Sequence, residues 1–98
     1  GRIPAFLAKA FDIFSNPEFE NECGWSPNGE SIIIKDAHNF AQRVLPKYFK
    51  HGNVQSFTRQ LNMYDFRKVV NDPTDGEFTH ALFKRGQRHL LPFIKRKV

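Results

Sequence analysis

The segment 56–68, SFTRQLNMYDFRK, concentrates guanidinium, amide and hydroxyl groups between apolar residues. The paired N–H donors of the Arg59 guanidinium match the O6 and N7 acceptors of guanine. The amides of Gln60 and Asn62 can pair bidentately with adenine. A solvated helix face more often carries Lys and Glu, whereas this segment has no acid before Asp65. The residue types therefore indicate a surface that reads purine edges in DNA. On composition alone, they also fit a polar helix face that binds nothing.

The spacing of apolar residues predicts that this segment is an amphipathic helix. At about 100° per residue, four apolar side chains fall within about 80° of one another and form the predicted core face: Val54, Phe57, Leu61 and Tyr64. The residues on the opposite face, centred on Arg59, are Gln55, Ser56, Asn62 and Met63. Asn53 is a good N-cap, and Phe66 would project from the polar face if the helix continued. We therefore expect a helix over about residues 53–65.

A helix and a hairpin are expected before this segment. Pro4 suits the first turn of a helix, and the apolar residues that would line one face of it are Phe6, Leu7, Ala10, Phe11 and Phe14. This helix should end before Pro17, because proline disfavours helical backbone in the residue that precedes it. Residues 23–26 and 31–35 are predicted strands, joined by a Pro-Asn-Gly turn.

A second helix is predicted after the hairpin. Asp36 is a good N-cap, and the apolar stripe that follows at spacings of three and four consists of Ala37, Phe40, Ala41, Val44, Leu45, Tyr48 and Phe49. Pro46 interrupts this stripe, since proline removes one backbone hydrogen bond and clashes with the preceding turn. The stripe keeps its register beyond the proline. We therefore expect a kink or bulge there rather than the end of the helix.

The rest of the chain predicts a second hairpin, with strands over 67–70 and 77–83 around the turn 71–76. The apolar residues near the C-terminus are expected to pack back on the domain: Leu90, Leu91, Phe93 and Ile94. The order helix, hairpin, helix, short turn, helix, hairpin predicts an α+β fold. It is a winged helix-turn-helix in which a small antiparallel β-sheet caps a three-helix bundle, and residues 1–98 form one domain.

Composition and charge favour a polyanionic partner. The 98 residues are 40% hydrophobic and include 11 Phe, which is enough for a buried core. Residues 1–34 carry two basic and five acidic side chains, whereas residues 35–98 carry thirteen basic and five acidic ones. A net charge of +5 that is concentrated in one region is typical of a nucleic-acid-binding domain.

Other functions are disfavoured. Cys23 is the single cysteine, so no internal disulfide forms, and a reducing compartment is expected. The four histidines form no ligand-spaced pair, and we expect neither a metal nor another cofactor. No motif supplies an orienting group for Cys23 as a nucleophile, so we expect no enzyme. No apolar run has the length of a membrane span, and no charged start with an apolar core resembles a signal peptide.

Four motifs span the chain in order: PAFLAKAFDIF, GWSPNGESIII, LPKYFKHGNVQSFTRQLNMYDFRKV and FKRGQRHLLPFIKRKV. In sequence and spacing they resemble the DNA-binding domain of heat shock transcription factors, and the resemblance covers essentially the whole chain. It implies a nuclear, sequence-specific transcription factor. Its recognition helix would read inverted nGAAn repeats of heat shock elements in double-stranded DNA.

The resemblance also implies roles for individual residues. Arg59 would read the guanine, with Ser56 and Asn62 beside it in base readout. The residues implied in contacts with the DNA backbone, or in support of the helix, are Lys50, His51, Asn53, Gln60, Tyr64, Lys68 and Arg85. Neighbouring copies of the domain would bind adjacent GAA units. A full-length protein would form a homotrimer through a coiled coil outside these residues.

Some features differ from the family pattern or leave alternatives open. Asp65 replaces a common glycine and places a negative charge at a helix C-terminus, so we expect it to face a basic neighbour such as Lys68. The wing turn is shorter than in animal members, whose wing faces the neighbouring protein. The cluster Lys95-Arg96-Lys97 fits a nuclear localisation signal or a solubilising end. Two alternative functions are a winged-helix protein-interaction module and the DNA-binding domain of a related stress-response regulator.

Overall fold

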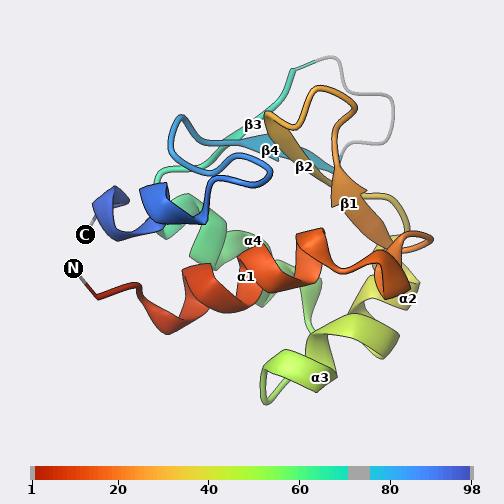
Figure 1. The fold of residues 1–98 in the computed structure, drawn as a ribbon. Coiled ribbons are helices and arrows are strands. Elements are labelled where there is room, and N and C mark those ends of the chain that lie inside the picture. The colour runs from red at the N-terminus through yellow and green to blue at the C-terminus, as the bar shows by residue number, and fades with distance from the viewer. Residues whose placement is uncertain (1, 71–75, 98) are drawn as a thin grey trace.

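The computed structural model describes residues 2–70 and 76–97. Its α-helices are α1 (Ala5–Ser15), α2 (Ala37–Asn39), α3 (Leu45–Tyr48) and α4 (Val54–Met63). The strands of its antiparallel sheet are β1 (Cys23–Trp25), β2 (Ser31–Ile34), β3 (Arg67–Lys68) and β4 (Glu77–Thr79), in the order β1-β2-β4-β3. Figure 1 shows α1 passing in front of α4, with the sheet above both helices. The predicted α+β winged helix-turn-helix is confirmed.

The first predicted hairpin is present, and each of its strands is one residue shorter than expected. β1 pairs with β2 so that Cys23 lies opposite Ile34. Gly29 in the connecting turn has a φ of 74°, which glycine adopts without the steric penalty of a Cβ. The residue types of the turn thus agree with its backbone.

The second hairpin is also present, because β3 pairs with β4. The predicted strands over 67–70 and 77–83 are longer than β3 and β4, and β4 ends where the chain turns at His80. The Phe83 N–H donates to the His80 carbonyl oxygen at 3.1 Å, and the turn brings Phe83 into the core. The turn residues 71–75, which make up most of the predicted wing, lie outside the described residues.

Pro46 is accompanied by the bulge that the sequence predicts. Residues Phe40–Val44, between α2 and α3, form a π-helical turn in which a backbone N–H donates to the carbonyl oxygen five residues earlier. Proline lacks an N–H and crowds the carbonyl group four residues before it, so a wider turn accommodates it. Asp36 caps the start of this run, since its Oδ1 accepts from the Asn39 N–H at 3.1 Å.

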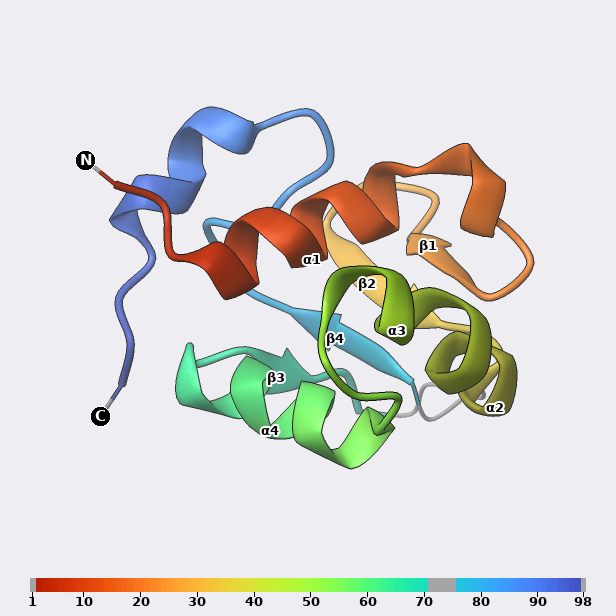
Figure 2. The same ribbon diagram turned by 90° about the horizontal axis from the view of Figure 1, so that it is seen from below.

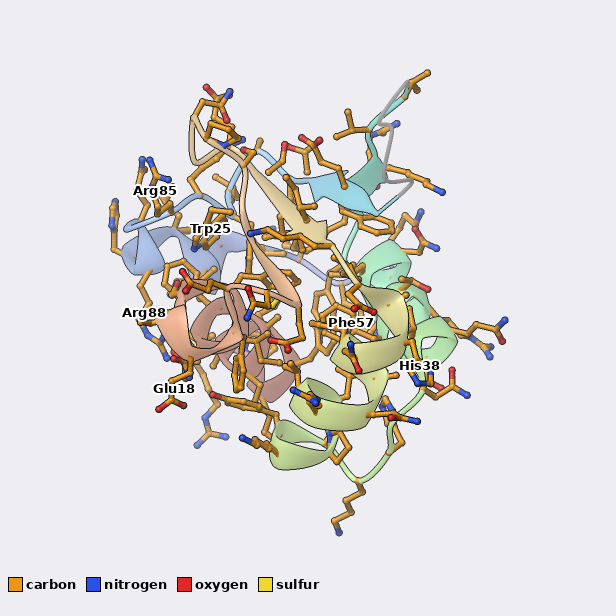
Figure 3. The ribbon with its side chains drawn as sticks, turned by 90° about the vertical axis from the view of Figure 1, so that its right-hand side faces the viewer. Glu18, Trp25, His38, Phe57, Arg85 and Arg88 are labelled. Atoms are coloured by element: carbon orange, nitrogen blue, oxygen red, sulfur yellow. The ribbon has the colours of Figure 1, made fainter. Side chains whose placement is uncertain are left out.

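Phe57 of α4 lies inside an aromatic core, among the helices in Figure 3. The rings whose centroids lie 5.3 to 6.1 Å from the Phe57 centroid are Phe6, Phe14, Phe40 and Phe49. They come from α1, from the π-helical turn and from the end of α3. Leu61, one turn further along α4, is also fully buried. The predicted core face of this helix therefore packs it against α1, the π-helical turn and the end of α3.

The C-terminal segment packs back on the domain through a 3-10 helix, Arg88–Phe93. Leu91 and Ile94 are buried as predicted, and Leu90 is half-buried. The prediction is wrong for Phe93, which is 66% exposed. With about three residues per turn, positions 91 and 94 share a face that position 93 does not. Within the described ranges, no helix has the length and apolar character needed to cross a membrane.

Candidate nucleic-acid interface

The N-terminal end of α4 is held by a side-chain cap. The Asn53 Oδ1 accepts from the Ser56 N–H at 3.1 Å, which confirms the predicted N-cap. The cap satisfies the Ser56 N–H, and the remaining first-turn N–H groups lie at the positive end of the helix dipole. This end of the helix is therefore suited to an anionic partner.

The C-terminal end of α4 closes in a Schellman motif. The Asp65 N–H donates to the Asn62 carbonyl oxygen, and the Phe66 N–H donates to that of Leu61, both at 3.0 Å. This motif needs a left-handed residue, and Asp65 accordingly has a φ of 65°. The helix ends at Met63 and Phe66 turns into the core, as its predicted placement requires.

The outer face of α4 is polar and open to solvent. Gln55, Ser56, Arg59 and Asn62 are all exposed, and Figure 2 shows no other segment of the described chain over this side of the helix. Among the described residues, none forms a hydrogen bond or ion pair with the Arg59 guanidinium. A planar cation without an internal partner is available to an external acceptor.

A hollow of about 590 Å³ lies on one side of α4, and we call it the turn hollow because it borders the α3–α4 turn. Its polar and basic lining residues are Lys9, Lys47, Lys50, His51 and Gln60. Lys50, His51 and Gln60 were predicted from the sequence as backbone or supporting residues. The structure brings these three to one side of the helix.

His51 has a fixed orientation in the turn hollow. Its Nδ1 accepts from the Asn53 N–H at 3.1 Å, and its ring stacks on Phe49 at a centroid distance of 5.7 Å. Because Nδ1 accepts, the proton of the neutral ring lies on Nε2. The imidazole therefore presents a hydrogen-bond donor at its free nitrogen.

A second hollow, of about 440 Å³, lies between α4 and the sheet, and we call it the sheet hollow. Asn62 and Thr58 of α4 line it together with Lys35 and Lys68. The Lys35 Nζ donates to the Glu20 carbonyl oxygen at 2.9 Å, so part of its hydrogen-bonding capacity is used within the protein. The polar face of α4 thus has a lysine-bearing hollow on each side.

Two predicted site residues are engaged elsewhere. Tyr64 is half-buried, and its ring stacks on Phe6 of α1, so it supports the end of α4 from within. The Arg85 N–H donates to the Gly29 carbonyl oxygen at 2.9 Å, which places Arg85 beside the β1–β2 turn. In Figure 3 Arg85 lies on the opposite side of the molecule from α4. The structure does not bring Arg85 together with the other predicted residues.

Lys9 and Thr58 are additional members of this region that were not predicted. Thr58 lies one position before Arg59, and its hydroxyl donates to the Gln55 carbonyl oxygen at 3.2 Å. Lys9 is on α1 and reaches the turn hollow only because α1 packs against α4. Helical spacing could have suggested Thr58 as a flank of the polar face, whereas no sequence pattern connects Lys9 with α4.

Cys23 is buried at 1% exposure. Burial raises the pKa of its thiol to about 12, with a further contribution from the neighbouring charge of Glu22. The group is therefore a neutral thiol at physiological pH. A neutral, buried thiol lacks the nucleophilic form that thiol catalysis needs.

The fold and the open face together define a class of protein. A helix lies across a tight turn from the preceding helix, and basic hollows flank it. Its outer face carries exposed amides and an arginine that has no partner in the part of the chain that the structure describes. This is the arrangement of a winged helix-turn-helix DNA-binding domain. The chain belongs to the family of HSF-type DNA-binding domains, whose model matches residues 6–97.

Heat shock factor protein 1 of Bos taurus and that of Homo sapiens are each 50% identical to this chain over 105 residues. The matched region covers 98% of this chain and 20% of each relative, so the chain spans about a fifth of their length. The solved structure of Chaetomium thermophilum Skn7 with HSE DNA has a TM-score of 0.88 and 36% identity, covering 95% of this chain and 100% of that one. A heat shock transcription factor/DNA complex has a TM-score of 0.71 and 45% identity, and the match covers 79% of this chain and 94% of that chain.

Proposed function

We propose that residues 1–98 act as one domain that reads inverted nGAAn repeats of heat shock elements in double-stranded DNA. α4 would lie in the major groove as the recognition helix. The observation that carries this proposal is the exposed Arg59 guanidinium, which has no partner among the described residues. The names of the relatives add support, since they include heat shock factors and a protein solved with HSE DNA.

In this proposal, base readout and backbone contact are divided between the helix face and its flanks. Arg59 pairs with the guanine of the GAA unit, and Ser56 and Asn62 contact neighbouring base edges. The residues that contact or support contacts to the phosphate backbone are Lys50, His51, Asn53, Gln60 and Lys68. Lysines on both sides of the helix suit the two phosphate chains that border a major groove. Arg85 lies beside the β1–β2 turn, away from α4 (Figure 3), and its assignment to the DNA backbone stays a prediction that this division does not use.

The assembly and location of the whole protein are inferred from its relatives. Neighbouring copies of the domain would bind adjacent GAA units, and a homotrimer would form through a coiled coil outside these residues. The site of action would be the nucleus. Because the chain spans about a fifth of the curated relatives, these statements concern a longer protein than the domain described here.

A second candidate follows from the structural comparison. The TM-score of 0.88 to Skn7 exceeds the 0.71 to the heat shock factor complex, and Skn7 has also been solved with SSRE DNA. The chain could therefore be the DNA-binding domain of a related stress-response regulator. This candidate keeps the same recognition helix and adds SSRE DNA to HSE DNA as a target, since Skn7 has been solved with both.

A single titration tests both candidates. Fluorescence anisotropy would measure binding of the domain to three labelled duplexes: an inverted GAA repeat, an SSRE sequence and a scrambled repeat, each at two salt concentrations. We expect selective binding to the GAA repeat, with an affinity that falls steeply as salt rises. Preference for SSRE would favour the second candidate. Equal, weak and salt-insensitive binding to all three would refute DNA reading and favour a protein-interaction module.

A further inference from the structure

The turn hollow contains a cation that belongs to neither helix of the helix-turn-helix unit. Lys9 lies on α1, whereas Lys50 and His51 lie in the turn between α3 and α4. All three line one continuous hollow, and none of the described residues in that lining is acidic. The hollow is therefore positive along its rim, with contributions from segments about forty residues apart in the chain.

The position of Lys9 is set by aromatic packing. Phe6, one turn earlier on α1, contacts the Phe49 ring at a centroid distance of 5.8 Å. The Lys9 Nζ lies 5.4 Å from the centroid of that same Phe49 ring. His51 stacks on Phe49 as well, so Lys9 and His51 both contact this one ring.

Lys9 is free to take an external partner. Its side chain is exposed, and none of the described residues forms a hydrogen bond or ion pair with it. Lys47, which also lines the hollow, is directed toward a different ring, with its Nζ 5.4 Å from the Phe19 centroid. Lys9 is thus the lysine of α1 that a chain of phosphates beside α4 would meet.

We propose that Lys9 binds a backbone phosphate of the DNA, on the same strand segment that Lys50 and His51 contact. The proposal rests on the proposed function and extends the DNA contacts from the helix-turn-helix to α1. A compact ammonium group suits a phosphate oxygen, and the His51 Nε2–H supplies a neutral donor in the same hollow. Such a contact positions the domain on the duplex and carries no base information.

The test compares two variants, each of which removes one positive charge from a different part of the surface. Lys9→Gln removes the proposed contact and keeps most of the side-chain stem. Lys84→Gln is the matched control, because the Lys84 Nζ donates to the Glu30 carbonyl oxygen beside the β1–β2 turn, away from α4. Binding to the GAA repeat and to the scrambled duplex would be measured over a series of salt concentrations, and melting temperatures would show that both variants are folded.

We expect Lys9→Gln to lower the log–log salt slope by about one unit and Lys84→Gln to leave it nearly unchanged. Between about 50 and 200 mM salt, wild type should then lose about three- to fourfold more affinity than Lys9→Gln. Both duplexes should show the same change, and Lys9→Arg should restore the wild-type slope.

A neutral methylphosphonate placed at successive positions beside the GAA unit gives a second measurement. At one position, the methylphosphonate should lower the DNA affinity of wild type and leave the DNA affinity of Lys9→Gln unchanged. A wild-type slope for Lys9→Gln, with selective GAA binding intact, would overturn the Lys9 contact and leave the proposed function standing. Absence of GAA selectivity in wild type would instead overturn the proposed function itself.

Discussion

The ring of Tyr64, immediately after α4, stacks on the ring of Phe6 in α1, with centroids 5.7 Å apart and planes 8° from parallel. Phe57 holds the first half of α4 in the core, and the Tyr64–Phe6 pair holds its C-terminal end. The orientation of the polar face therefore depends on a contact with α1.

We predict that Tyr64→Ala lowers the free energy of unfolding by about 2 kcal/mol, because it removes a half-buried aromatic contact. Tyr64→Phe should keep the stacking and nearly all the stability. Chemical denaturation followed by tryptophan fluorescence measures both. If Tyr64→Phe were as unstable as Tyr64→Ala, the hydroxyl group rather than the ring contact would matter.

Arg59→Lys keeps the positive charge and removes the planar guanidinium that can form two parallel hydrogen bonds. Lysine cannot engage both guanine acceptors at once, so the change should cost on the order of 1–3 kcal/mol of binding at the GAA site. Arg59→Ala should cost at least as much. The measurement is binding of each variant to GAA and to a duplex in which the guanine is replaced. Equal losses on both duplexes would make Arg59 a phosphate contact.

Neither Arg59 variant should alter the melting temperature noticeably, because the side chain is exposed and has no partner among the described residues. A large drop in melting temperature would mean that the binding defect reflects unfolding.

Asp65→Gly should stabilise the domain. A left-handed backbone costs an L-residue on the order of 1–2 kcal/mol, and the flexibility of glycine in the unfolded chain offsets part of the gain. The lost ion pair with Lys97, 3.9 Å away and half-exposed, is worth little. We expect a net gain of about 0.5 kcal/mol, measured by chemical denaturation.

Asp65→Asn is the matched control, since it removes the charge and keeps a side chain at the left-handed position. The difference between the Gly and Asn variants reports the relief of backbone strain less the entropy that glycine adds to the unfolded chain, without the contribution of the charge. If Asp65→Gly were less stable than wild type, the contact with Lys97 would outweigh that strain.

Asp36 should make stability depend on pH. The Asn39 backbone N–H, and then the Asn39 side-chain amide, hold the pKa of the Asp36 carboxyl below its ordinary value of 3.8. With the folded pKa below the unfolded one, the capping contribution is fully present above the unfolded pKa. It is lost as the pH falls through the folded pKa.

Asp36→Ala should therefore be less stable than wild type at neutral pH, and the difference should shrink as the pH is lowered below about 4. Asp36→Asn keeps an oxygen acceptor without a titrating group, so the difference between it and Asp36→Ala should not vary with pH. Unfolding curves at several pH values measure both differences. A wild-type advantage that is constant down to pH 2 would contradict the assignment.

The recognition helix could be predicted from the sequence because its two faces differ in residue type along one helical period. Phe57 and Leu61 are buried and Arg59 is exposed, as that period requires. The placement of Phe66 indicated where the helix must end. The bulge before Pro46 followed from the missing N–H of proline. These are local effects, in which a few neighbouring residues determine the outcome.

Features that depend on tertiary contacts were predicted less well. The turn at His80 ends β4 early and brings the Phe83 side chain into the core. The position of Arg85 beside the β1–β2 turn follows from no local pattern, and its assignment to the DNA backbone stays a prediction. Lys9 joins the α4 region only through the packing of α1. The packing of the whole core determines which distant segments come together, so no single stretch of sequence predicts such contacts.

β2 and β4 are hydrogen-bonded neighbours although α2, α3 and α4 all lie between them in the chain, with Ile32 opposite Phe78. Forming this pair closes a long loop, which carries an entropic cost that a lone hairpin could not offset in water. The two hairpins therefore become stable only together, and the loop they close contains the recognition helix. Loss of the β2–β4 pair releases both ends of that loop at once. We therefore expect DNA binding and the native fold of this domain to be lost in one cooperative transition.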